Sequence, residues 1–124
     1  MPTNPTIAEV QIFGIRKSQA TRAAERFFKE RKIKIHFVDL DERAIAPGEL
    51  KRFLERFGWN GVLDIGSKAY QDAGLEYLRV SDAGMVAKVT ADPRLLLLPL
   101  VRAGKHVSAG LAEDTWKSWL ETKR

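Results

Sequence analysis

The chain has 124 residues, of which 44% are apolar and 30% are charged, and its formal net charge at pH 7 is +5. This composition is typical of a single globular domain, and the absence of cysteine excludes disulfides, thiolate nucleophiles and cysteine-bound metals. The longest apolar run, residues 95–101, is too short to cross a membrane, and residues 1–5 lack the pattern of a secretory signal, so we expect no membrane association and a cytoplasmic location.

The positive charge favours an anionic partner, such as a small oxyanion, an acidic protein surface or nucleic acid. Acidic residues are interspersed with the basic ones, however, and no zinc-finger or RNP-type signature occurs, so there is no strong nucleic-acid signal. A solvated basic surface is the simpler interpretation. The two histidines, His36 and His106, stand apart in apolar contexts, which argues against a metal site.

The first third of the chain predicts a strand, a helix and a second strand. Residues 8–15 are apolar in loose alternation, which predicts a buried strand that ends at Gly14. From Ser18 the apolar spacing changes to three and four, which predicts a helix with Ser18 as its N-cap. Residues 33–40 alternate again. Because a helix separates the two strands, we expect them to be parallel, with a right-handed crossover.

The middle of the chain, about residues 46–92, is predicted to be a helical insertion. Its expected elements are a helix from Pro47 to a stop at Gly58, a loop or short apolar element over 59–65, a helix over 68–78 broken by Gly74, and a helix over 81–91.

The last third predicts an antiparallel hairpin and a closing helix. Ala103-Gly104 occupies the place of a two-residue hairpin turn, and residues 105–108 form the returning strand. Residues 113–121 carry Trp116 and Trp119 at helical spacing, which is more typical of core packing than of a ligand site.

The order strand–helix–strand, helical insertion, hairpin and helix is that of a thioredoxin-like fold. We therefore expect an α/β domain with a four-stranded mixed sheet over residues 8–122, after a loose tail of residues 1–7.

Three stretches carry motifs. Residues 13–31 read FGIRKSQATRAAERFFKER, residues 93–101 read PRLLLLPLV, and residues 102–116 combine RAGK with a later glycine and tryptophan. Together they resemble the FG-x-K-K-C-x-x-T-K-K-A-x-R-F-F-K-E-R, N-P-x-L-x-x-R/T-P-I-V and R-N-G-K…G…W motifs of the arsenate reductase-related (ArsC/Spx) family, especially its small glutaredoxin-type members. The resemblance covers nearly all of residues 9–121.

The resemblance implies a thiol oxidoreductase or arsenate reductase that uses glutathione as co-substrate and no other cofactor. The family's nucleophilic cysteine falls on Ser18, however, and the second cysteine of its two-cysteine regulators falls on Thr21. Two arginines that bind the anion in the family fall on Ile65 and Leu98. Pro99 matches the family's proline, which implies a cis peptide facing the helix start.

The serine changes the expected chemistry. The field of a helix end, worth about 1 kcal/mol, is far too weak to ionise a hydroxyl, and a serine nucleophile depends on an adjacent base. No histidine is predicted near Ser18, and serine forms no disulfide with glutathione. We therefore expect no thiol redox activity and no arsenate reduction in this chain, and whether it is an enzyme stays open.

Two explanations fit Ser18. The chain is a natural degenerate member kept for its shape or for a partner, or it is an active reductase whose cysteine was replaced by engineering. Ile65 and Leu98 favour the first explanation, because one engineered change would not remove both arginines as well. A further alternative is a Spx-like regulatory protein that binds an acidic or RNA-polymerase surface, which the positive charge permits.

The helix start could still bind an anion or a thiol ligand such as glutathione, because unpaired N–H groups and several cations converge there. The simpler interpretation is an ordinary N-cap with solvated cations. The predicted site consists of Ser18 at the position of the family's cysteine and of Arg16, Lys17, Thr21, Arg22 and Pro99 as binding residues.

Overall fold

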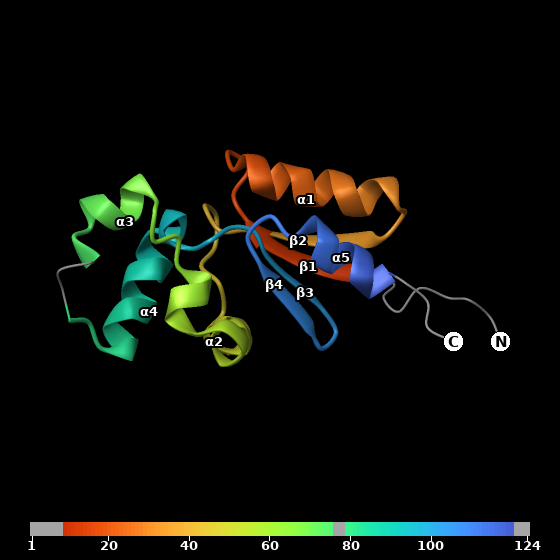
Figure 1. The fold of residues 1–124 in the computed structure, drawn as a ribbon. Helices are drawn as coiled ribbons and strands as arrows, with labels where there is room; N and C mark the ends of the chain where they lie inside the picture. Colours follow the sequence, from red (N-terminus) through yellow and green to blue (C-terminus); the bar gives the residue numbers. More distant parts are fainter. Residues whose placement is uncertain (1–8, 76–78, 121–124) are drawn as a thin grey trace.

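The computed structural model describes residues 9–75 and 79–120. Four strands form one mixed sheet in the order β2-β1-β3-β4, with β1 parallel to β2 and the other neighbours antiparallel (Figure 1). The predicted thioredoxin-like α/β sheet, with its parallel unit and its hairpin, is thus confirmed. The strands are β1 (Glu9–Gly14), β2 (Lys34–Asp39), β3 (Leu100–Ala103) and β4 (His106–Ala109).

Helices cover both faces of this sheet. Residues of α1 and α5 share one apolar cluster with the sheet, and residues of α2 and α4 share another. In Figure 1, α3 and α4 lie beyond one end of the sheet, and the turn between β3 and β4 points the other way. The helices are α1 (Gln19–Glu30), α2 (Pro47–Val62), α3 (Lys68–Asp72), α4 (Asp82–Ala91), the 3-10 turn η2 (Pro93–Leu95) and α5 (Glu113–Leu120).

The alternation of β1 divides the core into these two clusters. Ile12 belongs to the cluster under α1 and α5, whereas its neighbour Phe13 belongs to the cluster under α2. Trp116 is fully buried and its ring lies 5.4 Å from that of Phe28, while its Nε1 donates to Ser108 Oγ at 2.8 Å. The prediction that the tryptophans pack in the core is therefore confirmed.

The helix that begins at Pro47 extends further than predicted. Gly58 has φ 68 and ψ 175, so it interrupts α2, but the helix resumes and continues to Val62 in place of the predicted loop. Trp59 explains the continuation, because its Nε1 donates to Asp82 Oδ1 at 3.1 Å and its carbonyl accepts from Leu63 N at 3.0 Å.

The hairpin turn differs from the prediction by one residue. The strand includes Ala103, and the turn consists of Gly104 and Lys105. Gly104 has φ 62, and a glycine with positive φ at the first turn position suits a type II′ hairpin, whose twist matches that of its strands.

The helix predicted over 68–78 is shorter in the structure, because α3 ends at Asp72 and Gly74 has φ 67. The remainder of that prediction lies partly in residues 76–78, outside the described residues. The tail predicted for residues 1–7 and the end of the closing helix at Glu121 also lie outside them.

Candidate functional site

Ser18 lies where β1 leads into α1 and caps that helix, as predicted. Its Oγ accepts a hydrogen bond from Thr21 N at 3.1 Å, and its own N–H donates to Ile15 O at 3.1 Å. The hydroxyl therefore satisfies one of the N–H groups that a helix start leaves unpaired. In this arrangement it acts as a backbone cap, and its geometry provides no means of removing its proton.

Neither histidine lies near Ser18. His36 Nε2 lies 3.1 Å from Glu9 Oε1, at the beginning of β1, whereas Ser18 follows the other end of that strand. His106 stacks on Trp119 with ring centroids 5.6 Å apart, beside the hairpin turn. Both rings are thus at the far end of the sheet, and Ser18 has no imidazole to act as its general base.

The arginines of the predicted site already have partners within the fold. Arg16 lies over the ring of Phe37 at 4.7 Å, and its Nε is 3.6 Å from Asp39 Oδ2, so its side chain is directed toward β2. Arg22 Nη1 donates to the carbonyl oxygen of Arg16 at 2.7 Å and thereby fastens the loop before the helix. These contacts fit the simpler interpretation of a capped helix start, and the anion pocket stays a prediction.

Thr21 is packed beneath the helix start instead of facing solvent. It is fully buried, and a Cβ at Gly14 would collide with its side chain. Its Oγ1 has no hydrogen-bond partner among the described residues. The close fit shows why a glycine ends β1 here: any larger residue would displace Thr21.

Pro99 lies at the same end of the sheet as Ser18, because Leu100 pairs with Phe13 near the end of β1. The Leu98–Pro99 peptide is cis, as the resemblance implied, and Pro99 is buried. Leu98 is only 9% exposed, whereas Ile65 is 47% exposed. Both positions therefore hold apolar side chains that cannot bind an anion.

A hollow of about 420 Å³ lies beside the helix start and includes Lys17. Its charged lining is balanced, because Lys17 and Arg94 are matched by Asp41 and Asp92. Arg94 Nε donates to Asp92 Oδ1 at 2.9 Å, and this hydrogen bond holds the pKa of the Asp92 carboxyl below its usual value. The hollow thus offers an anion little net attraction.

Sequence reasoning identified Ser18 and Pro99 but missed the charged neighbours of Lys17. Asp92 and Arg94 are separated from Lys17 by more than seventy residues, so no local pattern connects them. The one available signal was the sequence Asp92-Pro93-Arg94, because an aspartate before a proline is typical of a helix cap; its Oδ1 accepts from Arg94 N at 3.1 Å.

Within residues 9–75 and 79–120, no three side chains of the metal-binding types gather closely enough to hold an ion. No helix in the same part of the chain is sufficiently long and apolar to cross a bilayer.

Residues 13–119 match the ArsC family. The fold is similar to that of the YFFB protein, with a TM-score of 0.79 and 20% identity over 90% of this chain and 98% of that one. It is also similar to an arsenate reductase from Vibrio cholerae (TM-score 0.76, 20% identity, 92% and 99% covered) and to an arsenate reductase (ArsC) related protein from Brucella melitensis (0.62, 18%, 89% and 92%). At these identities the structural likeness shows the fold alone. No curated protein sequence matches the chain.

Proposed function

Since the chain belongs to the ArsC family, we propose that it keeps the family's thioredoxin-like scaffold but carries out no thiol-dependent reduction. The observation that supports this most directly is the role of Ser18, whose Oγ accepts from Thr21 N at 3.1 Å and has no adjacent base. The chain then acts by binding and not by redox chemistry.

The electron balance of the reaction supports the same proposal. Reduction of arsenate to arsenite takes up two electrons, which thiols supply by forming a disulfide. A serine hydroxyl has no equivalent oxidised form, and the 124 residues contain no cysteine that could replace it. Ile65 and Leu98 also provide no positive charge for the oxyanion.

The first test measures arsenite formation by the chain with glutathione as electron donor. We expect the rate to equal that of buffer with glutathione, because the protein offers no thiol. Arsenite formed in proportion to the amount of protein would overturn the proposal.

The second test separates a missing thiol from a missing anion site. Ser18→Cys places a thiol at the start of α1, and Ser81→Cys is its matched control, because Ser81 caps α4 and accepts from Gly84 N, also at 3.1 Å. We expect both variants to form mixed disulfides with glutathione and neither to reduce arsenate. Arsenate reduction by Ser18→Cys alone would instead identify an active reductase whose cysteine has been replaced.

The net charge of +5 favours a second candidate, a Spx-like regulatory protein that binds an acidic partner surface. Its test is co-purification with RNA polymerase from the native cell. A stoichiometric complex would support it, and polymerase that elutes without this chain would count against it.

A further inference from the structure

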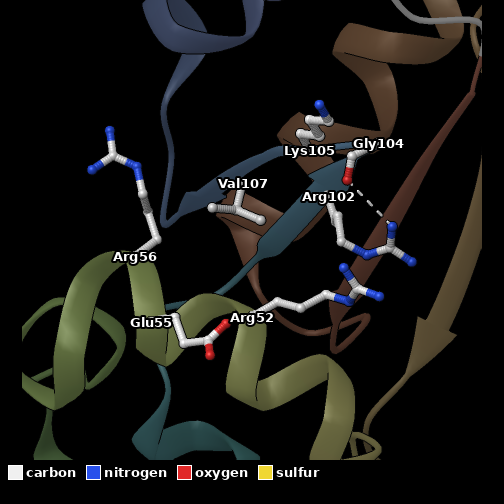
Figure 2. A pocket seen from close by; sticks show the side chains of 7 residues that line it. All are labelled: Arg52, Glu55, Arg56, Arg102, Gly104, Lys105 and Val107. Carbon is white, nitrogen blue, oxygen red and sulfur yellow. Dashed lines mark hydrogen bonds between the residues drawn. The ribbon is translucent and has the colours of Figure 1, made fainter.

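An open hollow of about 330 Å³ lies between α2 and the β3–β4 hairpin, at the opposite end of the sheet from Ser18 (Figure 2). Cationic side chains dominate its lining, and they come from two elements that are far apart in the sequence. The residues that matter to its chemistry are Arg52, Glu55 and Arg56 on α2 and Arg102, Lys105 and Val107 on the hairpin.

Arg102 forms a fixed wall of this hollow. Its Nε and Nη2 donate to the two carboxylate oxygens of Glu49 at 2.8 and 2.7 Å, and Nη2 also donates to Gln11 Oε1 at 2.7 Å. The side chain is only 18% exposed. A two-point pair of this kind holds the guanidinium in one orientation, and Glu49 neutralises its charge.

The other cations have no such partners. Among the described residues, the side chains of Arg52, Arg56 and Lys105 make no hydrogen bond or ion pair, and all three residues are exposed. Glu55 is the carboxylate in the lining. With Arg102 neutralised by Glu49, three cations face one carboxylate, so the hollow carries an excess of two positive charges.

Figure 2 shows how these side chains are arranged. Arg52 extends from α2 toward Arg102, whereas Arg56 and Lys105 stand on the helix side and the hairpin side of the hollow. Val107 lies between these sides and provides an apolar surface. Like charges on two elements repel one another, and an anion with two or more negative groups would remove that repulsion.

We propose that this hollow binds a small anion that carries at least two phosphate or carboxylate groups, with its carbon part or ester oxygens against Val107. Guanidinium groups bind both kinds of oxyanion through paired N–H donors, which fits the two arginines of α2. The volume lies within the range of small-molecule sites. This inference goes beyond the proposed function and does not depend on the state of Ser18.

Two features favour a small anion over a nucleic acid. The excess charge is confined to one hollow that also contains Glu55, and a strand of phosphates would need cations along a longer path. No aromatic side chain lines the hollow, so bases would have no surface on which to stack.

The experiment titrates the full chain at low salt with inorganic pyrophosphate and, separately, with citrate, and follows heat release and amide NMR shifts. We expect saturable binding of at least one probe, with the largest shifts at residues 52–56 and 102–107. Arg56→Gln with Lys105→Gln should weaken it at least about tenfold, since both changes remove charged donors.

The matched control is Arg26→Gln with Lys29→Gln, which removes the same charge from exposed positions on α1. This control should retain the affinity within about twofold, and thermal unfolding should show that both double variants are folded. Binding of pyrophosphate alone assigns a phosphate ligand, and binding of citrate alone assigns a carboxylate ligand.

Three results would overturn the proposal. They are no saturable binding of either probe at 10 mM, on the order of a weak salt interaction, equal loss of affinity in the two double variants, and binding only of an acidic peptide such as oligoglutamate. The last result would assign the surface to a protein partner.

Discussion

Cations at the two ends of the sheet are treated differently by the fold. At the start of α1, Arg16 is held by Phe37 and Asp39, and Arg22 is bonded to the backbone of the preceding loop. Beside the hairpin, Arg56 and Lys105 reach into a hollow without partners among the described residues.

The difference shows that a sequence motif and an available charge give different information. The motif around Ser18 shows where the family places its chemistry, but in this chain the polar groups there stabilise the fold itself. The hollow beside Arg102 has no motif, yet its cations are not needed by their neighbours. We therefore expect changes at the helix start to affect stability and changes in the hollow to affect binding.

The largest effect on stability is expected for Gly14→Ala. Its Cβ would collide with the buried side chain of Thr21, and overpacking of this kind costs about 2 kcal/mol of unfolding free energy. Urea denaturation measures the loss. Gly48→Ala is the control, because a Cβ there meets nothing within 4 Å. Adding Thr21→Ala to Gly14→Ala should recover part of the loss, and no recovery would show that the collision is elsewhere.

Ser18→Ala should lower the free energy of unfolding by about 1 kcal/mol, because α1 loses the acceptor for Thr21 N. Ser18→Asp should lie within a few tenths of a kcal/mol of the wild type, since aspartate caps helices well and its charge suits their N-terminus. Equal losses in the two variants would mean that Ser18 does not contribute as a cap.

Asp92→Asn should have a smaller effect that depends on pH. The pKa of Asp92 is lowered in the folded state, chiefly by the hydrogen bond from Arg94. Its stabilisation is therefore present above the unfolded-state pKa, about 4, and is lost as the pH falls through the folded-state value. The variant should be less stable than the wild type at pH 7 and approach it in strong acid. A difference that is the same in urea titrations at pH 7 and pH 2.5 would contradict this assignment.

The smallest effect on stability is expected for Arg56→Gln with Lys105→Gln. Neither side chain has a partner in the described fold, so the free energy of unfolding should change by less than about 0.5 kcal/mol. Thermal or urea unfolding of this double variant tests the comparison directly. A loss above about 1 kcal/mol would place these cations with the structural ones at the other end of the sheet.

The sequence predicted the sheet because its information is local. Alternation marked β1 and β2, and Ser18 marked the start of α1. Errors arose where glycine has more than one role. Gly58 interrupts a helix without ending it, and Gly104 begins the hairpin turn and does not complete it.

The hollow could not be predicted in the same way. Arg102 meets Glu49 and Gln11 across 53 and 91 residues, and only the pairing of β1 with β3 and the position of α2 bring them together. The motif located Ser18 and Pro99 correctly at one end of the sheet. It contained no information about whether Arg16 and Arg22 would be engaged by the fold.

The burial of Leu98 also bears on how reversible this chain's history is. A return from Ser18 to cysteine exchanges one atom at a partly exposed helix cap. A return from Leu98 to arginine would place a charged group where the present side chain is 9% exposed, and it would need neighbouring substitutions to accept it. The step back at position 18 is small, whereas the step at position 98 works like a ratchet against re-evolution of the ancestral reaction.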